Sequence, residues 1–78
     1  MNARQWISSY AQRLGSEPPT AREWSALLDL AGEAAHASER VAAPVACWVA
    51  AKAGVSADEA LTAARELAAA DAHTDDAG

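Results

Sequence analysis

The chain has 78 residues and a formal net charge of −5, with only six lysines and arginines against eleven aspartates and glutamates. This length allows at most one small domain, and chains this short bury a smaller fraction of their surface than longer ones. The charge balance argues against nucleic acids and anionic membranes as partners, because both are bound largely through Lys and Arg.

The compartment follows from three features of the sequence. Residues 1–15 lack the long apolar core of a signal peptide, and the most hydrophobic segment, residues 41–51, is too short to span a bilayer. A lone cysteine, Cys47, cannot form an intramolecular disulfide. We therefore expect a cytoplasmic protein.

The first predicted helix covers residues 2–14. Asn2 can cap its start, and Gly15 suits the left-handed position past its end. Between them, apolar residues recur at helical spacing, namely Trp6, Ile7, Tyr10 and Leu14.

The second predicted helix begins at Thr20 and ends near residues 38–41. Thr20 and Glu23 have the spacing of a capping box, in which hydroxyl and carboxylate satisfy free backbone N–H groups reciprocally. One face of this helix is apolar and should meet the core. That face comprises Trp24, Leu27, Leu28, Ala31, Ala34 and Ala35.

The third and fourth predicted helices follow the same signals. Pro44 fits the first turn of the third helix, and Gly54 can close it. Because residues 41–51 carry no charge, this helix should be the most buried element. Ser56 and Glu59 repeat the capping-box spacing and open the fourth helix, whose apolar stripe is Leu61, Ala64, Leu67 and Ala68.

No segment shows the alternating pattern of a strand, so the sequence predicts an all-α fold, a small compact bundle of four short, Ala-rich helices. We expect one helical domain over residues 1–70 and a flexible tail over 71–78, with His73 solvated. Since alanine dominates the last two helices, much of the apolar burial should come from Trp6, Trp24 and Trp48.

A polar stripe on the second helix is the strongest functional feature. Asp29, Glu33, His36 and Arg40 are spaced by four, three and four residues, which places them within an arc of about 60° on a helix. The simplest interpretation is a solvated face, since the stripe lies opposite the apolar face. A second is a recognition surface in which Arg40 pairs with a carboxylate or phosphate and His36 responds to pH.

A third interpretation is a metal site. Glu33 and His36 form a Glu-x-x-His pair, the spacing that offers a carboxylate and an imidazole from one helix in di-metal bundles. Such a site needs a second pair, which this chain could supply only as a dimer. Cys47, next to Trp48 in an apolar segment, should have a raised pKa and be inert.

Residues 27–44 also carry a family pattern: LLDLAGEAAH, then ER, then AAP before an apolar helix. This order resembles the actinobacterial family DUF6457, a small domain of unknown function, along most of the chain. The matching positions are Asp29, Glu33, His36, Arg40, Ala42, Ala43 and Pro44. The chain departs from the family at Cys47 and Trp48, where small or other apolar residues are usual.

The resemblance implies a context. The family occurs alone or fused behind the nucleotidyltransferase that converts molybdopterin into its guanine dinucleotide form, and it appears beside formate dehydrogenase accessory proteins. It therefore implies a helical accessory or docking module in molybdenum-cofactor maturation, with one of these proteins as its partner. The expected partner-binding residues are Asp29, Glu33, His36, Arg40 and Pro44.

We expect no enzymatic activity and no cofactor, because the sequence contains neither a complete catalytic constellation nor the Gly-rich loop of the transferase. Two alternative functions stay open. One is a dimeric protein that binds a metal or small ligand through Glu33 and His36, and the other is a self-associating regulatory protein, favoured by the shortage of large core residues.

Overall fold

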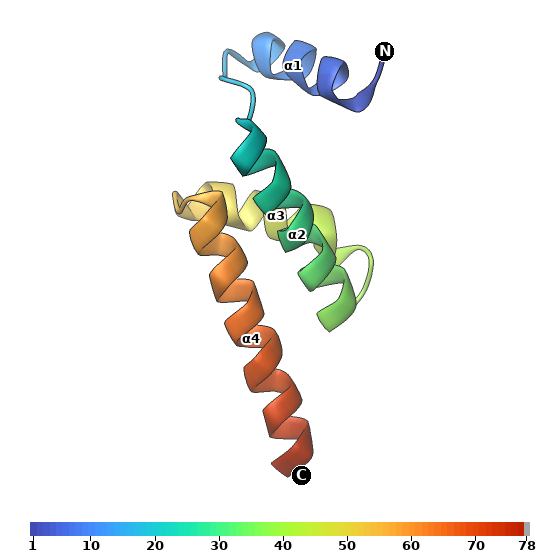
Figure 1. Ribbon diagram of the computed structural model, residues 1–78, viewed down its shortest axis with the longest axis vertical. Helices are drawn as coiled ribbons and strands as arrows, with labels where there is room; N and C mark the ends of the chain where they lie inside the picture. Colours follow the sequence, from blue (N-terminus) through green and yellow to red (C-terminus); the bar gives the residue numbers. More distant parts are fainter. Residues whose placement is uncertain (78) are drawn as a thin grey trace.

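The computed structural model describes the backbone of residues 1–77 and the side chains of residues 1–71. Within this part the chain forms four α-helices and no strand (Figure 1). The helices are α1 (Ala3–Leu14), α2 (Ala21–Ala37), α3 (Ala42–Ala53) and α4 (Ala57–Ala77). The predicted all-α bundle of four helices is confirmed, and none of the described helices is long and apolar enough to cross a membrane.

The first two helix starts are capped as the sequence predicts. Thr20 Oγ1 accepts from Glu23 N at 3.1 Å, and Thr20 N donates to Glu23 Oε1 at 2.8 Å. Asn2 caps α1 through an equivalent pair of bonds with Gln5, at 2.8 and 2.9 Å. These bonds satisfy N–H groups that a helix leaves free at its start.

The remaining boundaries are set by Gly, Pro and Ser. Gly15 and Gly54 end α1 and α3 with φ of 73° and 76°, in the left-handed region that favours glycine. Pro44 lies in the first turn of α3, where its missing N–H has no partner to lose. At the start of α4, Ser56 Oγ accepts from Glu59 N at 3.1 Å.

Helix α2 is the centre of the fold, with α3 and α4 packed against it. Figure 1 shows α1 across one end of this body and the end of α4 projecting beyond α2 at the other. The molecule measures 48 × 23 × 18 Å as a result. The core lies where the three packed helices meet: Leu30 is 3 % exposed and contacts the buried Ala60 and Leu61 of α4.

The prediction that the third helix is the most buried element is wrong. No residue of α3 is buried, and Val45, Trp48 and Val49 are 59 %, 63 % and 53 % exposed. The reason is that α3 turns its small side chains inward: Cys47 and Ala50 pack on the core. A helix that is apolar on every side but has a neighbour on only one keeps the rest of its apolar surface uncovered.

The expected role of the tryptophans is also wrong for two of them. Trp6 and Trp48 are more than half exposed, and Trp24 is half-buried. Their rings find local partners instead: Trp6 stacks on Tyr10 at 5.1 Å, Arg4 covers Trp24, and Lys52 covers Trp48. Alanines and leucines, rather than indoles, therefore form the core.

The core face of α2 differs from the predicted one. Its buried residues are Ala26 and Leu30, whereas Leu28 is 61 % exposed and Leu27 is half-buried. At 100° per residue, the observed face is rotated by about 120° from the predicted face. The physical reason is that α2 is apolar on two sides, and the side with Trp24, Leu27 and Leu28 borders a groove of about 550 Å³ toward α1.

Helix α4 continues to Ala77, into the segment 71–78 that was predicted as a flexible tail. The flexibility of this segment stays a prediction. The side chain of His73 lies outside the described residues, so its predicted solvation is untested.

Candidate functional site

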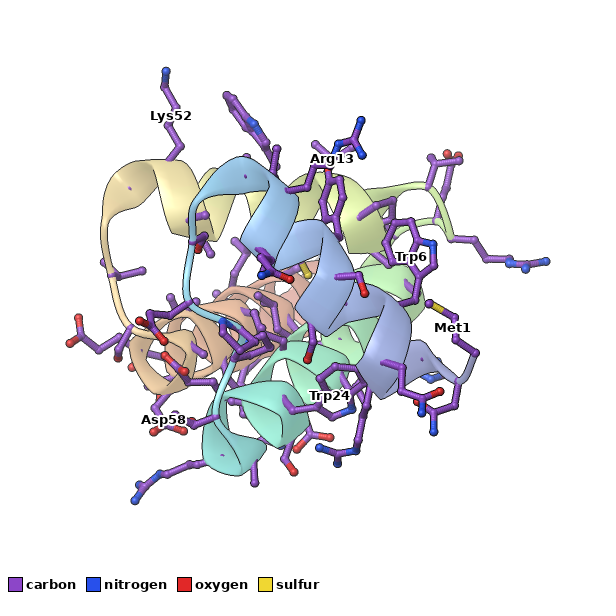
Figure 2. All side chains as sticks on the ribbon, turned by 90° about the horizontal axis from the view of Figure 1, so that it is seen from above. Met1, Trp6, Arg13, Trp24, Lys52 and Asp58 are labelled. Carbon is purple, nitrogen blue, oxygen red and sulfur yellow. The ribbon has the colours of Figure 1, made fainter. Side chains whose placement is uncertain are left out.

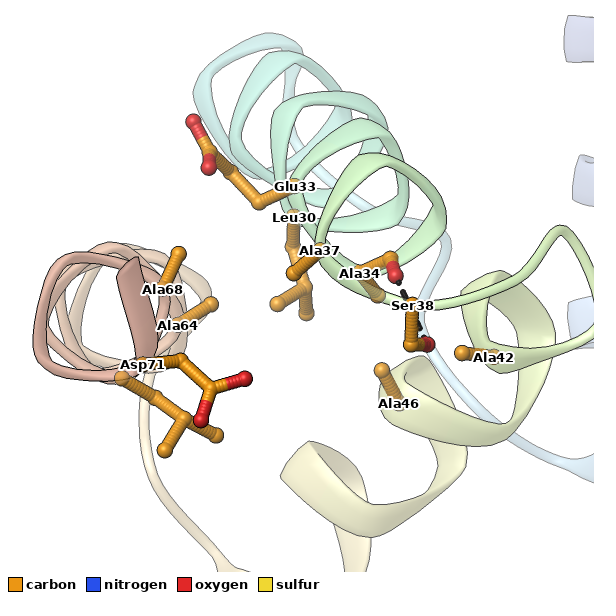
Figure 3. Close-up of a pocket in the computed structure, with 11 residues that line it drawn as sticks. Leu30, Glu33, Ala34, Ala37, Ser38, Ala42, Ala46, Ala64, Ala68 and Asp71 are labelled. Carbon is orange, nitrogen blue, oxygen red and sulfur yellow. Dashed lines mark hydrogen bonds between the residues drawn. The ribbon is translucent and has the colours of Figure 1, made fainter. Parts of the chain in front are cut away.

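A cleft of about 300 Å³ opens where α4 runs past the end of α2, with the start of α3 as its third wall (Figure 3). Its lining is mostly alanine. The lining residues are Leu30, Glu33, Ala34, Ala37, Ser38, Ala42, Ala46, Ala64, Leu67, Ala68 and Asp71. Because alanine carries only a methyl group, three helices can converge here without filling the space between them.

The cleft is apolar in depth and polar at its edges. Leu30, the most buried of these side chains, belongs to the core, whereas Leu67 is exposed. The polar groups are Glu33 of α2, Asp71 of α4 and Ser38 at the end of α2. Figure 3 shows the carboxylate of Asp71 directed into the space between the helices.

Glu33 is linked to the opposite helix. Arg65 Nε of α4 donates to Glu33 Oε1 at 3.4 Å, and the Glu33 side chain is 34 % exposed. The guanidinium partly neutralises this carboxylate, whereas Asp71 stays exposed. The Ser38 hydroxyl already has a hydrogen-bond partner in α2, because its Oγ donates to the Ala34 carbonyl at 3.2 Å. The cleft thus has apolar walls and a mildly acidic rim.

The predicted four-residue stripe is not continuous. Asp29, Glu33 and His36 lie on α2, but Arg40 lies beyond its end, in the turn where its carbonyl accepts from Ala43 N at 3.1 Å. The helix stops because Ser38 leaves helical geometry, with φ −140° and ψ −95°. The prediction that Arg40 shares a helix face with Glu33 is therefore wrong.

Only one of the predicted partner-binding residues lines the cleft. Glu33 lines the cleft, while Asp29 and His36 are exposed on α2 outside it. Pro44 is exposed in the first turn of α3. The structure therefore places one of the five predicted residues, Glu33, in this site, and the cleft itself was not predicted. The feature of the sequence that could have predicted the cleft is the presence of two Ala-rich segments, residues 34–46 and 64–68.

Glu33 and His36 are the residues of the predicted metal site. Among the described residues, no group of three or more His, Cys, Asp or Glu side chains is placed to hold a metal ion. Glu33 is also engaged by Arg65. A metal bound by this pair would therefore need further ligands from another chain or from outside the described side chains.

Cys47 lies at the edge of the core, half-buried against Leu30, Ala60 and Leu61. Burial raises the pKa of its thiol, because the thiolate loses solvation. The direction agrees with the predicted inert cysteine, since the thiolate is the nucleophilic form.

The sequence reasoning also missed an exposed apolar surface. We call it the α1–α3 face and define it by Trp6 and Tyr10 of α1 with Val45, Trp48 and Val49 of α3, each at least half exposed. The sequence predicted burial here from the helical spacing of apolar residues in residues 6–14 and from the absence of charge in residues 41–51. Periodicity reports which residues share a face, but it does not report whether another element covers that face.

Comparison with known proteins adds a family. The model of DUF6457, a domain of unknown function, matches residues 1–76. Searches of curated proteins and of solved structures found no significant match.

Proposed function

The chain belongs to the DUF6457 family, and we propose that it is a non-catalytic docking module that binds an amphipathic helix of a partner protein in the cleft between α2, α3 and α4. The observation that carries this proposal is the cleft itself: an open apolar space of about 300 Å³ walled by alanines and edged by carboxylates.

The chemistry of the walls selects the ligand. Grooves between helices recognise apolar side chains that a partner helix presents at three- and four-residue spacing. Alanine walls leave room for bulky side chains such as Leu or Met, and Leu67 at the rim adds apolar surface that is exposed before binding. Each buried methylene contributes about 0.8 kcal/mol to such binding.

The rim carboxylates set the charge of the partner. Asp71 and Glu33 favour Lys or Arg beside the apolar residues of the incoming helix. The net charge of −5 acts in the same direction, because long-range attraction raises the association rate of a basic partner. The resemblance of residues 27–44 to the family pattern names a partner class: a molybdenum-cofactor nucleotidyltransferase or a formate dehydrogenase accessory protein.

The proposal is tested by titrating the purified chain with such a nucleotidyltransferase in a calorimeter. Filling the mouth of the cleft with Ala37→Leu should weaken binding about tenfold or more, since the added side chain occupies the space of the ligand. The matched control is Ala69→Leu, at an exposed position of α4 outside the cleft. Equal affinities for both variants would reject the cleft as the docking site.

Charge reversal tests whether the partner binds in the cleft or along the polar stripe that the sequence predicted. Asp71→Arg should weaken binding of a basic helix, whereas Glu66→Arg and Arg40→Glu, both outside the cleft, should not. Circular dichroism checks that each variant stays helical. A loss of binding in Arg40→Glu alone would move the docking site to the turn between α2 and α3.

A further inference from the structure

The α1–α3 face consists of large apolar side chains from two helices, and each of them is at least half exposed. Figure 2 shows Arg13 of α1 and Lys52 of α3 toward the upper edge, Trp24 and Asp58 toward the lower edge, and Trp6 between them at the right. Trp48 and Trp6 are the largest members of the face, and both are more than half exposed. Exposed apolar patches of this kind mark interaction sites in soluble proteins.

The whole chain exposes more surface than its mass explains. Its accessible surface is 6076 Å² for 8.0 kDa. A monomeric globular protein of this mass exposes about 4,450 Å² by the usual scaling of surface with mass. The excess of about 1,600 Å² belongs to the whole elongated chain, the projecting end of α4 included, and it exceeds the roughly 800 Å² that one partner buries in a standard protein interface.

The charge distribution removes the main obstacle to pairing two acidic chains. Neither α1 nor α3 contains an aspartate or glutamate, so all eleven acidic residues lie outside the two helices that build this face. The charges on these helices are Arg4, Arg13 and Lys52. Two copies that meet through these helices therefore bring no carboxylates of α1 or α3 together.

The pattern on α3 suits a two-fold contact. Val41, Val45, Trp48 and Lys52 follow one another at four-, three- and four-residue spacing, the repeat by which paired helices interlock. In a centred antiparallel pairing of two α3 helices the two Lys52 side chains lie on opposite sides of the two-fold axis, roughly 14 Å apart along the helices. Such an isologous pairing is the commonest symmetry of soluble oligomers.

From these observations we propose that the α1–α3 face is the interface of a symmetric homodimer, with α3 of one copy packed on α3 of the other. This dimer is independent of the docking function, because none of Trp6, Tyr10, Val45, Trp48 and Val49 lines the cleft. The cleft between α2, α3 and α4 stays free in each copy.

The first test measures the mass of the full chain by sedimentation equilibrium across about 1–200 µM, the range of typical protein dimers. The wild type should approach twice 8.0 kDa. Val45→Glu places a charge in the proposed contact and should raise the dissociation constant about 100-fold or more. The control, Leu67→Glu, adds the same charge at an exposed leucine of the cleft and should remain dimeric.

A second measurement covers the case in which Val45→Glu fails to fold. In a Trp6→Phe, Trp24→Phe variant, Trp48 is the only indole, and its quenching by acrylamide reports its exposure. Quenching should fall at least about twofold as concentration rises through the dimerisation range, because the ring leaves water. A wild type that stays monomeric to 200 µM, a dimer broken by Leu67→Glu but not by Val45→Glu, or unchanged quenching of Trp48 would each overturn the proposal.

Discussion

Arg65 and Glu33 join α4 to α2 across the edge of the cleft, with Arg65 Nε 3.4 Å from Glu33 Oε1. The pair links Glu33, a predicted functional residue, to the neighbouring helix α4. The sequence had linked Glu33 to His36 on its own helix. The long-range pair connects residues 32 positions apart, which helical spacing alone could not reveal.

We predict that this pair contributes little to stability. The Arg65 side chain is 56 % exposed and the Glu33 side chain is 34 % exposed. Ion pairs in contact with solvent typically contribute about 0–1 kcal/mol. Arg65→Ala should lower the free energy of unfolding by about 0.5 kcal/mol in urea at low salt, and 1 M NaCl should remove the difference. Arg22→Ala, which breaks the more exposed pair with Asp58, is the control. A loss above about 2 kcal/mol for Arg65→Ala would contradict a solvent-screened pair.

A second prediction tests the orientation of α2. Leu30 is 3 % exposed at the centre of the core, so Leu30→Ala should cost about 2–4 kcal/mol. Leu28→Ala removes the same atoms from a side chain that is 61 % exposed and should cost less than about 0.5 kcal/mol. Urea unfolding followed by circular dichroism measures both. If Leu28 proved the costlier position, the core face predicted from periodicity would be the right one.

This comparison shows where sequence reasoning succeeds and where it stops. The starts and ends of the helices depend on atoms a few residues apart, and the boundaries at Thr20 with Glu23 and at Gly54 were predicted correctly. Which face of a helix is buried depends on elements elsewhere in the chain. For α2, with apolar residues on two sides, and α3, apolar throughout, the pattern could not choose between the faces.

The candidate site illustrates the same limit. Glu33 was singled out correctly as a residue of interest, but the cleft depends on how Ala-rich segments of three helices leave space between them. Arg40 was misplaced because Ser38 ends α2 two residues before it. A shift of a helix end by one turn is small for a fold but decides whether a side chain belongs to a site.

A third prediction concerns the helix caps. Thr20 begins the central helix, so Thr20→Ala should lower the free energy of unfolding by about 1 kcal/mol. Asn2 caps α1 with the same geometry, but α1 lies outside the core formed by Leu30, Ala60 and Leu61. Asn2→Ala should therefore fray α1 and leave global unfolding within about 0.3 kcal/mol of the wild type.

Amide hydrogen exchange separates the two effects. Thr20→Ala should speed exchange across α2, α3 and α4 together, whereas Asn2→Ala should speed it in residues 3–14 alone. A global loss of protection in Asn2→Ala would show that α1 is a cooperative part of the core.

The last prediction concerns pH and Cys47. Burial raises the pKa of this thiol above its value in the unfolded chain, so the folded state keeps its proton where the unfolded state loses it. The contribution of this thiol to the free energy of unfolding is fully present below the ordinary thiol pKa, near 8.5. It falls as the pH rises from there through the folded-state pKa. Urea unfolding between pH 7 and 10 should show this decline in the wild type and less of it in Cys47→Ala, which removes the ionisable thiol and leaves a space of about one atom at the edge of the core. If the slope of stability against pH is the same in Cys47→Ala as in the wild type, the alkaline decline comes from other groups. Fast modification of Cys47 by a thiol reagent at pH 7 would contradict its desolvation.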